Sequence, residues 1–484
     1  MLTELLYEQA RARPGHPALR HGADQLTYGE LIERVERLAH GLAGRGVRAG
    51  DSVGLVLSNG PAFVTSFFAL AGLGAAAVPI NPAFMRDELE FSLRACGVHA
   101  IIAGEESRAV CERIARDWEY PLQVITAGPA GDGGVSLDAL LAGNDPLTLE
   151  PRGLGETVME QFSSGSTGRP KRLCRTHGQC TAEARSYTWV GPEDRVFCAV
   201  PLFHTYGLGC CLLAALCRGA TLVVMPEPNP FLLHRARALE LLEREACTVF
   251  PGVPFNFRLL ADAPVDADLS ALRLCFSAGT ALDRGTFDAF LRRFGVPVRQ
   301  LYGCTEAGTL TANLDPDPVA TFASVGRPVG EVDVTVVDGE VSVASPALTA
   351  GYADLPELTR DVFGGGRFRT GDLGLLEPDG SLVLTGRKKL LIQVGGYKVD
   401  PVEVQDVVCS HPKVHDAVVL GVPSGVATDE RVKAVVVPAA ELSDRELIQY
   451  CRERLANFKV PQIVERREEI PTSPLGKVLR KYML

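Results

Sequence analysis

Several features that identify whole classes of protein are missing from this sequence of 484 residues. There is no excess of basic residues, because 49 Lys and Arg stand against 59 Asp and Glu, giving a net charge of −10. Proteins that bind nucleic acid generally carry a basic surface, so no nucleic-acid partner is expected. An anionic small molecule remains possible, because backbone N–H groups can bind phosphate on an acidic protein.

No Cys-x-x-Cys pair occurs among the 13 cysteines, so neither a zinc ribbon nor a thioredoxin-type site is expected. We expect reduced thiols that behave as small hydrophobic residues in a cytoplasmic protein. The first eight residues include Glu4 and Glu8 and lack the apolar core of a signal peptide. The longest uncharged run, residues 62–80, contains polar residues, glycines and Pro79, which favours a buried helix and a buried strand over a membrane span.

What is present is the composition of a globular protein, with 46% hydrophobic and 22% charged residues. The length predicts two or more domains. Thr27 and Glu30 have the spacing of a capping box at the start of a helix. Short strands and helices then alternate, which predicts an α/β fold with a parallel or mixed sheet covered by helices. The predicted strands are residues 52–57, 75–80, 99–103, 122–126, 157–162, 221–225, 248–250 and 272–277.

The pattern changes after residue 331. Alternating valines around Asp338-Gly339 predict a β-hairpin, and a second hairpin is predicted at residues 375–385. A helix at 402–410, strands at 417–420 and 432–437, and a helix capped by Ser443 are expected to follow. We therefore predict a large N-terminal domain of sheets flanked by helices, residues 1–387, and a small C-terminal α+β domain, residues 388–484.

The sharpest motif is the nine-residue segment Ser-Ser-Gly-Ser-Thr-Gly-Arg-Pro-Lys at 163–171. Its glycines allow backbone N–H groups to turn inward, its hydroxyls are donors, and Arg169 and Lys171 are cationic, all of which suit a polyphosphate. The spacing is not that of a Walker A loop. By itself, the motif fits a polar surface loop and a phosphate site equally well.

Two further motifs contain acidic residues. In Tyr-Gly-Cys-Thr-Glu at 302–306, Tyr302 could stack on a base, and Thr305 with Glu306 could hold Mg²⁺ or a phosphate, although a strand end with a buried Tyr is the simpler alternative. In Arg-Thr-Gly-Asp-Leu-Gly at 369–374, Asp372 could accept both hydroxyls of a ribose. Its simpler alternative is a tight turn that precedes a hairpin.

These motifs, in this order and spacing, resemble the adenylate-forming superfamily of acyl-CoA synthetases, adenylation domains and luciferases over nearly the whole chain. The resemblance implies a mobile C-terminal domain, ATP, Mg²⁺ and a carboxylic acid as ligands, and CoA as the probable acceptor. It assigns the nucleotide to a phosphate-binding loop and an adenine pocket, namely Ser163, Ser164, Gly165, Ser166, Thr167, Gly168, Lys171, Ser277, Ala278, Gly279, Thr280, Tyr302 and Gly303.

The resemblance also assigns single roles. Thr305 corresponds to the α-phosphate contact, Glu306 to the Mg²⁺-associated acid, Asp372 to the ribose ligand, and Arg387 to a ribose or phosphate contact. Lys477 corresponds to the lysine that bridges the acid carboxylate and the α-phosphate.

Lys389 falls at the hinge position of the resemblance, and Gly395 and Gly396 fall in the loop that lines the acceptor tunnel. His204 corresponds to the gating position beside the acid pocket; a buried structural histidine is its simpler alternative.

The acid is less strongly indicated. Residues 175–177, Arg-Thr-His, resemble the aryl-acid adenylating enzymes. Members that take hydroxybenzoates usually have Asn after the gating His, whereas this chain has Thr205, and the Phe-His-x-Tyr-Gly form is closer to coumarate- and fatty-acid CoA ligases. Most members have Gly where this chain has Arg172.

Three functions follow as hypotheses. The first is a carboxylic acid–CoA ligase that forms an acyl-AMP and then an acyl-CoA. The second is a stand-alone adenylase that loads a carrier protein or makes an amide. The third is a nucleotide-binding protein without catalysis. The sequence does not indicate an oligomeric state.

Overall fold

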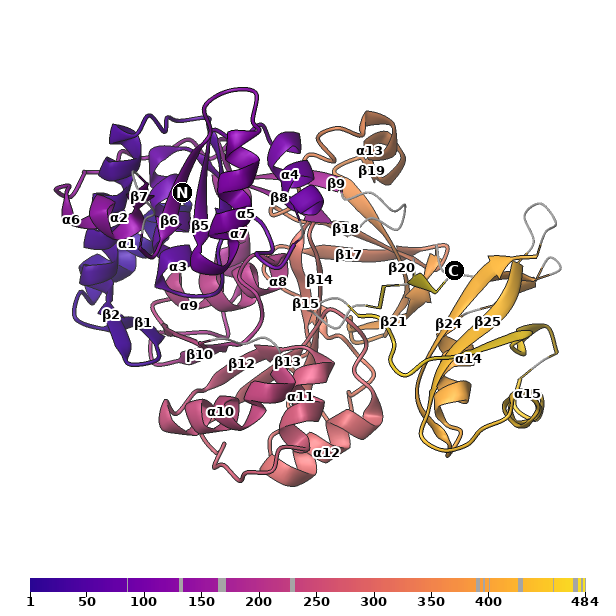
Figure 1. Ribbon diagram of the computed structural model, residues 1–484. Coiled ribbons are helices and arrows are strands. Elements are labelled where there is room, and N and C mark those ends of the chain that lie inside the picture. The colour runs from indigo at the N-terminus through magenta and orange to yellow at the C-terminus, as the bar shows by residue number, and fades with distance from the viewer. Residues whose placement is uncertain are drawn as a thin grey trace. The chain divides into compact units, whose positions relative to one another are not determined.

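The computed structural model describes residues 1–84, 86–129, 134–163, 171–226, 231–388, 392–394, 397–399, 401–424, 430–455, 457–472, 478–479 and 482–483. The chain divides into two compact units (Figure 1). The first contains the described residues up to 334 together with residues 343–368, and the second contains residues 335–342 and the described residues from 369 onward. The predicted boundary between residues 387 and 388 stays a prediction.

One sheet of the first unit has the strand order β7-β6-β5-β3-β4-β8-β9. Its strands run parallel except for the antiparallel pair β8–β9. Strands β3 and β5 are buried along their whole length and are apolar apart from Ser52, as expected for a sheet covered on both faces. The strands are β3 (Ser52–Val56), β4 (Ala76–Pro79), β5 (Ala100–Gly104), β6 (Gln123–Ala127), β7 (Val135–Ser136), β8 (Thr157–Ser163) and β9 (Lys171–Thr176).

A second sheet of this unit has the order β16-β15-β14-β13-β12-β10-β11-β1-β2. Its centre is parallel, and antiparallel pairs close both edges. The strands are β1 (Pro17–His21), β2 (Asp24–Thr27), β10 (Arg195–Cys198), β11 (Thr221–Val224), β12 (Val249–Gly252), β13 (Leu274–Ser277), β14 (Val298–Cys304), β15 (Gly308–Ala312) and β16 (Arg327–Pro328).

Helices cover both sheets (Figure 1). One buried cluster contains residues of both sheets, such as Leu55 and Phe276, together with Leu70 of α3. The helices of this unit are α1 (Leu2–Ala12), α2 (Tyr28–Gly44), α3 (Pro61–Leu73), α4 (Arg86–Ala95), α5 (Glu105–Arg116), α6 (Leu137–Ala142), α7 (His177–Ser186), α8 (Thr205–Gly207), the π-helix η1 (Leu208–Leu213), α9 (Ala214–Leu216), α10 (Phe231–Arg244), α11 (Pro254–Ala261), α12 (Arg284–Phe294) and α13 (Pro356–Val362). The short strand β19 (Phe363–Gly364) follows α13.

The local predictions for this unit are confirmed. The Thr27 hydroxyl accepts a hydrogen bond from the Glu30 amide, and the Glu30 carboxylate accepts one from the Thr27 amide, so the capping box is complete. The uncharged run forms the buried helix α3 and the buried strand β4. In the described part of the chain, no helix combines the length and the apolar character needed to cross a membrane.

The cysteines are unpaired, and most are buried, as the sequence predicts. Burial raises the pKa of the Cys180 thiol to about 11 and that of the Cys111 thiol to about 12. Thiols with a raised pKa are poor nucleophiles, so these side chains fill space rather than react.

The second unit contains the two predicted hairpins. Strands β17 (Asp333–Val337) and β18 (Glu340–Ala344) meet at Asp338 and Gly339, whose φ angles of 52° and 78° are those of the tight turn that Asp-Gly favours. Strands β20 (Arg367–Leu376) and β21 (Leu382–Arg387) form the other hairpin. Asp372 therefore lies within a strand, and the expected tight turn at this position is wrong.

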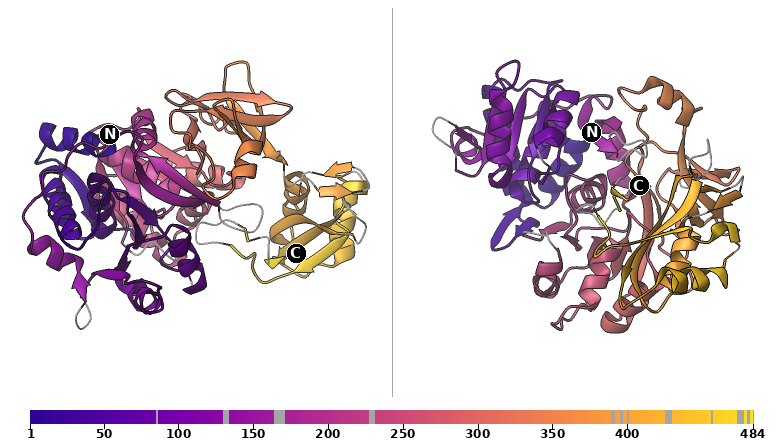
Figure 2. Two further views of the ribbon diagram at one scale, coloured as in Figure 1. Left: turned by 90° about the horizontal axis from the view of Figure 1, so that it is seen from above. Right: turned by 45° about the vertical axis from the view of Figure 1, so that its right-hand side comes forward.

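The rest of this unit packs α14 and α15 against strands around a core of valines (Figures 1 and 2). Ser443 caps α15 as predicted, because its hydroxyl accepts a hydrogen bond from the Glu446 amide. The carboxylate of Glu446 accepts a hydrogen bond from Lys413. The elements are β22 (Ile392–Val394), β23 (Tyr397–Val399), α14 (Pro401–Cys409), β24 (Val414–Pro423), β25 (Glu430–Pro438), α15 (Asp444–Arg452), the 3₁₀-helix η3 (Asn457–Lys459) and β26 (Ile463–Arg466).

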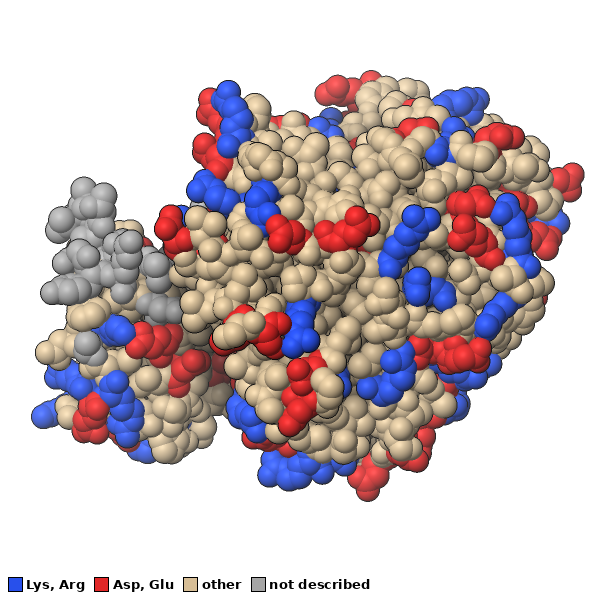
Figure 3. Space-filling model, turned by 180° about the vertical axis from the view of Figure 1, so that it is seen from behind, with Lys and Arg blue, Asp and Glu red and all other residues tan. Residues whose placement is uncertain are grey.

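The charged side chains on the surface are mixed in sign. On the face shown in Figure 3, Lys and Arg lie among Asp and Glu rather than in a continuous basic area. This distribution agrees with the near balance of 49 basic and 59 acidic residues in the sequence.

The first unit contains one ion pair that water does not reach. The side chains of Arg175 and Glu183 are 0% and 2% exposed, and Nη1 of Arg175 donates to Oε2 of Glu183 over 2.6 Å. Glu183 also accepts from the Tyr187 hydroxyl at 2.8 Å and from the Thr309 amide at 3.3 Å. Replacing only one partner of such a pair leaves an uncompensated buried charge.

We predict that Arg175→Met lowers the free energy of unfolding by about 3–5 kcal/mol, because the Glu183 carboxylate loses its cation. The double variant Arg175→Met/Glu183→Gln should recover part of this loss, since the remaining amide is neutral and still accepts hydrogen bonds. Urea unfolding of the three proteins measures both effects. A double variant that is as unstable as Arg175→Met alone would contradict the assignment.

Candidate functional site

The predicted phosphate-binding segment is framed by a β-hairpin. Ser163 ends β8, Lys171 begins β9, and the two residues are directly paired across the ladder. Both side chains are buried. Ser164, Gly165, Ser166, Thr167 and Gly168 lie outside the described residues. The described structure therefore gives the two ends of the segment, which are held side by side by strand pairing.

The Tyr-Gly-Cys-Thr-Glu motif lies at the end of β14. Tyr302 is a buried residue of that strand and pairs with Thr311 of β15. A Cβ added to Gly303 would stand 2.5 Å from the carbonyl oxygen of Gly308, so only glycine fits where the two strands approach. Thr305 and Glu306 occupy the turn that follows. The turn thus places these two side chains at the carboxyl end of a strand.

Glu306 contacts a residue that the sequence motifs do not include. Its Oε1 accepts a hydrogen bond of 2.8 Å from the hydroxyl of Tyr352, and the Nζ of Lys171 lies 4.7 Å from the centroid of the same tyrosine ring. The carbonyl of Glu306 accepts from the Thr349 amide at 2.8 Å. The structure therefore brings together two residues of separate motifs, Lys171 and Glu306, through one aromatic side chain.

The segment assigned to the adenine and acid pocket follows β13. Ser277 ends the strand and Ala278 comes next, and both are buried. Gly279 has a φ of 85°, a conformation that favours glycine, and Thr280 after it is exposed. Within the described part of the chain, the Ser277 hydroxyl has no hydrogen-bond partner.

His204 is exposed and caps the short helix α8, where its Nδ1 accepts from the amide of Tyr206 at 3.2 Å. The alternative of a buried histidine is therefore wrong. The hydroxyl of Tyr206 donates to the carbonyls of Gly252 and Phe276, at 3.0 and 3.1 Å, and so connects α8 to the strand that ends at Ser277.

Beside His204, the Thr205 hydroxyl donates to Oε1 of Gln161 over 3.1 Å. Gln161 lies on β8 and is 3% exposed, and its Nε2 has no hydrogen-bond partner among the described residues. A buried amide without an acceptor is costly, so a ligand is a natural partner. Gln161 belongs to none of the sequence motifs; the available signal is a polar residue next to Glu160 in a strand that is mostly buried.

The Arg-Thr-His segment supports the fold. Arg175 is committed to the buried pair with Glu183, Thr176 caps α7, and burial lowers the pKa of His177 to about 4. These residues therefore hold β9 and α7 in place, and their resemblance to aryl-acid enzymes does not by itself identify the acid.

Arg172 forms ion pairs with two carboxylates, those of Glu160 and Asp354. Its Nη1 donates to the buried carboxylate of Glu160 over 2.7 Å, and its Nε and Nη2 donate to the two oxygens of Asp354 over 2.9 and 2.8 Å. These hydrogen bonds hold the pKa of the Asp354 carboxyl below its ordinary value. Arg172, which replaces the usual glycine, thus links β8, β9 and the loop after β18.

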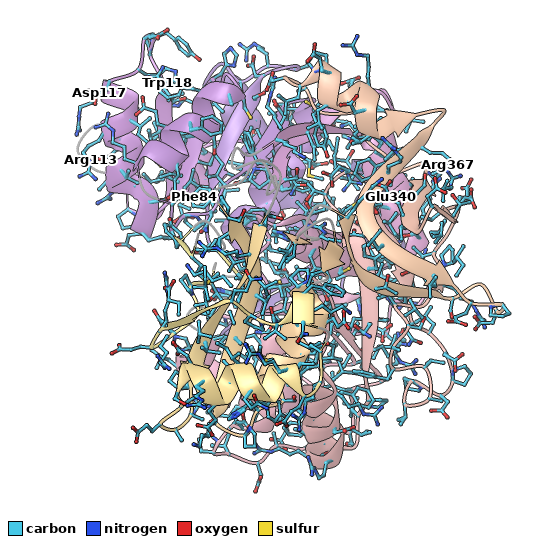
Figure 4. All side chains as sticks on the ribbon, turned by 90° about the vertical axis from the view of Figure 1, so that its right-hand side faces the viewer. Phe84, Arg113, Asp117, Trp118, Glu340 and Arg367 are labelled. Atoms are coloured by element: carbon cyan, nitrogen blue, oxygen red, sulfur yellow. The ribbon has the colours of Figure 1, made fainter. Side chains whose placement is uncertain are left out.

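In the second unit, Asp372 of β20 pairs with Arg387 of β21 across the ladder, and Nε of Arg387 donates to its carboxylate. Lys388 donates a hydrogen bond of 3.1 Å to Glu340 of β18, which is labelled in Figure 4. Lys389, Gly395, Gly396 and Lys477 lie outside the described residues.

The described residues contain no group of three or more His, Cys, Asp or Glu side chains that could hold a metal ion. Mg²⁺ is commonly bound by one or two carboxylates together with substrate phosphates and water, so it does not need such a group. Glu306, in the turn after β14 and in contact with Tyr352, is a carboxylate that could serve.

Comparison with protein-family models gives two matches. The model described as "AMP-binding enzyme" matches residues 6–353, and that described as "AMP-binding enzyme C-terminal domain" matches residues 403–477.

Comparison with single proteins gives relatives along the whole chain. A feruloyl-CoA synthase of an Amycolatopsis species is 35% identical over 491 residues, covering 98% of this chain and 96% of that protein. The crystal structure of the anthranilate CoA ligase AuaEII with anthranoyl-AMP is 27% identical with a TM-score of 0.87, covering 100% and 96% of the two chains. The amide bond synthetase McbA of Marinactinospora thermotolerans is 28% identical with a TM-score of 0.86, covering 100% and 99%.

Proposed function

The chain belongs to the AMP-binding enzyme family, and on this basis we propose that it is an AMP-forming acid–CoA ligase. In the first step a carboxylic acid attacks the α-phosphorus of ATP, forming an acyl-AMP and releasing pyrophosphate. In the second step the thiol of CoA attacks the acyl carbon, forming an acyl-CoA and releasing AMP. The observation that carries the proposal is the convergence of Lys171 and Glu306 on Tyr352, within a chain that both family models match.

The residues of the first unit suit the nucleotide. We assign the phosphates of ATP to the segment from Ser163 to Lys171, whose ends are paired in the β8–β9 hairpin. Tyr302 would stack on the adenine, and Thr305 would contact the α-phosphate. Glu306 would hold Mg²⁺, which neutralises charge on the departing pyrophosphate when it is bound.

The attack of a carboxylate on an anionic α-phosphate brings two like charges together. A cation at this point stabilises the transition state most, because charge concentrates there. We assign this role to Lys477 of the C-terminal domain. The acyl-AMP is a mixed anhydride and must be protected from water until the acceptor arrives.

A C-terminal domain that rotates about Lys389 accounts for two reactions in one site. In one orientation it would deliver Lys477 for adenylation, and in the other it would present Gly395 and Gly396 to the acceptor. Asp372 and Arg387, which already pair across β20 and β21, would bind the ribose.

For the acid, we propose an aryl acid that bears oxygen on its ring, such as an aryl-propenoic acid of the feruloyl type. The 35% identical relative is named a feruloyl-CoA synthase, and the segment around His204 has the form of coumarate- and fatty-acid CoA ligases. Gln161 supplies a buried amide donor next to Thr205, which a ring oxygen would satisfy.

A second function differs only in the acceptor. The likeness to an amide bond synthetase, with a TM-score of 0.86, favours transfer of the acyl group to an amine. Loading of a carrier protein belongs to the same alternative, because transfer to CoA, to an amine and to a carrier protein all start from the acyl-AMP.

We predict that the chain catalyses acid-dependent exchange of pyrophosphate into ATP, and that Lys477→Ala slows it roughly a hundredfold or more, the usual cost of one lost transition-state contact. Radiolabelled pyrophosphate measures the exchange. Lys413→Ala, which removes a half-buried lysine paired with Glu446, should exchange like the wild type. Normal exchange by Lys477→Ala would refute the role of this lysine.

We also predict that CoA, rather than a simple amine or a pantetheinylated carrier protein, consumes the acyl-AMP. The measurement is chromatography of the products after incubation with ATP, the acid and each acceptor in turn. Release of AMP with an amide product and without acyl-CoA would establish the second function instead.

Gln161→Leu keeps most of the side-chain volume and removes the amide. We predict that kcat/KM for a ring-oxygenated aryl-propenoic acid falls roughly tenfold or more, while that for the same acid without ring oxygens changes little, because a lost hydrogen bond is felt only by the substrate that makes it. The ratio of the two acids in the exchange assay is the readout. An equal loss for both acids would show that Gln161 does not select the substrate.

A further inference from the structure

Tyr352 is the residue on which two charged groups of the first unit meet. It lies in the loop between β18 and α13 and is 6% exposed. Its hydroxyl donates to Oε1 of Glu306 over 2.8 Å, and its ring faces the Nζ of Lys171, 4.7 Å from the centroid. None of the sequence motifs includes this tyrosine.

The loop that carries Tyr352 is fastened to β9. Tyr352 forms a bridge with Leu173, and the Ala353 amide donates to the carbonyl of Arg172 over 3.0 Å. Asp354, the residue after Ala353, fixes the same loop, because its carboxylate accepts two hydrogen bonds from Arg172. Because Lys171 belongs to the same strand, the tyrosine and the lysine are held by one short stretch of backbone.

The chemistry of the contacts suggests why a tyrosine is used. A carboxylate turns easily about its last side-chain bond, and one strong hydrogen bond to Oε1 leaves Oε2 with a defined direction. The phenol is a neutral donor, so this hydrogen bond places no countercharge beside Glu306. The ring face attracts the ammonium of Lys171 without neutralising it.

We propose that Tyr352 is a positioning residue of the adenylation site, which orients the Glu306 carboxylate for Mg²⁺ through its hydroxyl and holds the Lys171 ammonium for the phosphates through its ring. The inference rests on the proposed function and adds a residue to it. Tyr352 acts on the substrate through these two side chains rather than by contact.

The first test separates the hydroxyl from the ring. In EDTA, we expect Tyr352→Phe to bind ATP with the affinity of the wild type. The factor by which Mg²⁺ raises the affinity for ATP should be roughly tenfold smaller in this variant. Tyr352→Leu removes the ring as well and should weaken binding in EDTA by roughly a further threefold, because Lys171 loses its aromatic contact. Isothermal titration calorimetry with ATP, in Mg²⁺ and in EDTA, measures both quantities without turnover.

A buried hydroxyl elsewhere provides the matched control. Tyr28 is fully buried and donates to the carbonyls of Leu216 and Ala220. Tyr28→Phe should lower stability by a similar amount and leave the effect of Mg²⁺ on ATP binding unchanged. Equal losses in Tyr28→Phe and Tyr352→Phe would show a general effect of destabilisation and overturn the proposal.

A double-mutant cycle tests whether Tyr352 acts through Glu306. In a Glu306→Gln background, Tyr352→Phe should cause no further loss of the Mg²⁺-dependent affinity. Additive losses would overturn the proposal.

Asp354→Asn is a second variant, and it does not depend on how well Tyr352→Phe folds. The Asp354 side chain is largely exposed, and the substitution removes only the negative charge that pairs with Arg172. We expect the same direction of change with a smaller size, and an unchanged Mg²⁺ effect would count against the proposal. If the wild type shows acid-dependent exchange and these variants bind Mg²⁺·ATP normally, the positioning role fails and the proposed function stands. If the wild type shows no exchange with any acid, the proposed function itself fails.

Discussion

The first unit depends on an ion pair placed where water cannot screen it. Arg175 comes from β9 and Glu183 from α7, and the same carboxylate accepts from the amide of Thr309 in β15. One buried charge therefore ties an edge strand of one sheet to the other sheet. Separating one partner of a buried ion pair leaves an uncompensated charge, so this contact favours a single arrangement of β9 and β15. Those strands begin just after the phosphate-binding segment and just after Glu306.

The candidate site follows from the direction of the strands. Ser163, Ser277 and Cys304 end β8, β13 and β14, so three segments of different sequence reach the carboxyl ends of their strands. Open α/β sheets generally bind ligands at these ends, because the loops there are free to carry polar groups on a rigid frame. Thr305 and Glu306 thus follow a strand, β14, that is paired on both sides within its sheet.

The charged side chains near the site contact either a neutral aromatic residue or an oppositely charged group. Tyr352 contacts Lys171 and Glu306 at once, and Arg172 offsets the buried Glu160 while it anchors the loop of Tyr352. Anions such as the phosphates of ATP are stabilised best by a cation that is already held in place. An aromatic neighbour meets this requirement, since it attracts an ammonium group without cancelling its charge.

The alternation of strands and helices, the capping box at Thr27 and the Asp-Gly hairpin were all predictable, because they depend on neighbours within a few residues. Asp372 lies within β20 rather than in a turn, because pairing with Arg387 of β21 extends the strand through Gly371, which keeps a φ of 75°. Only the tertiary structure revealed Tyr352 as the common neighbour of Lys171 and Glu306, and Arg175 as a buried support. Those contacts join residues far apart in the chain, and local pattern has no means of specifying which distant side chains meet.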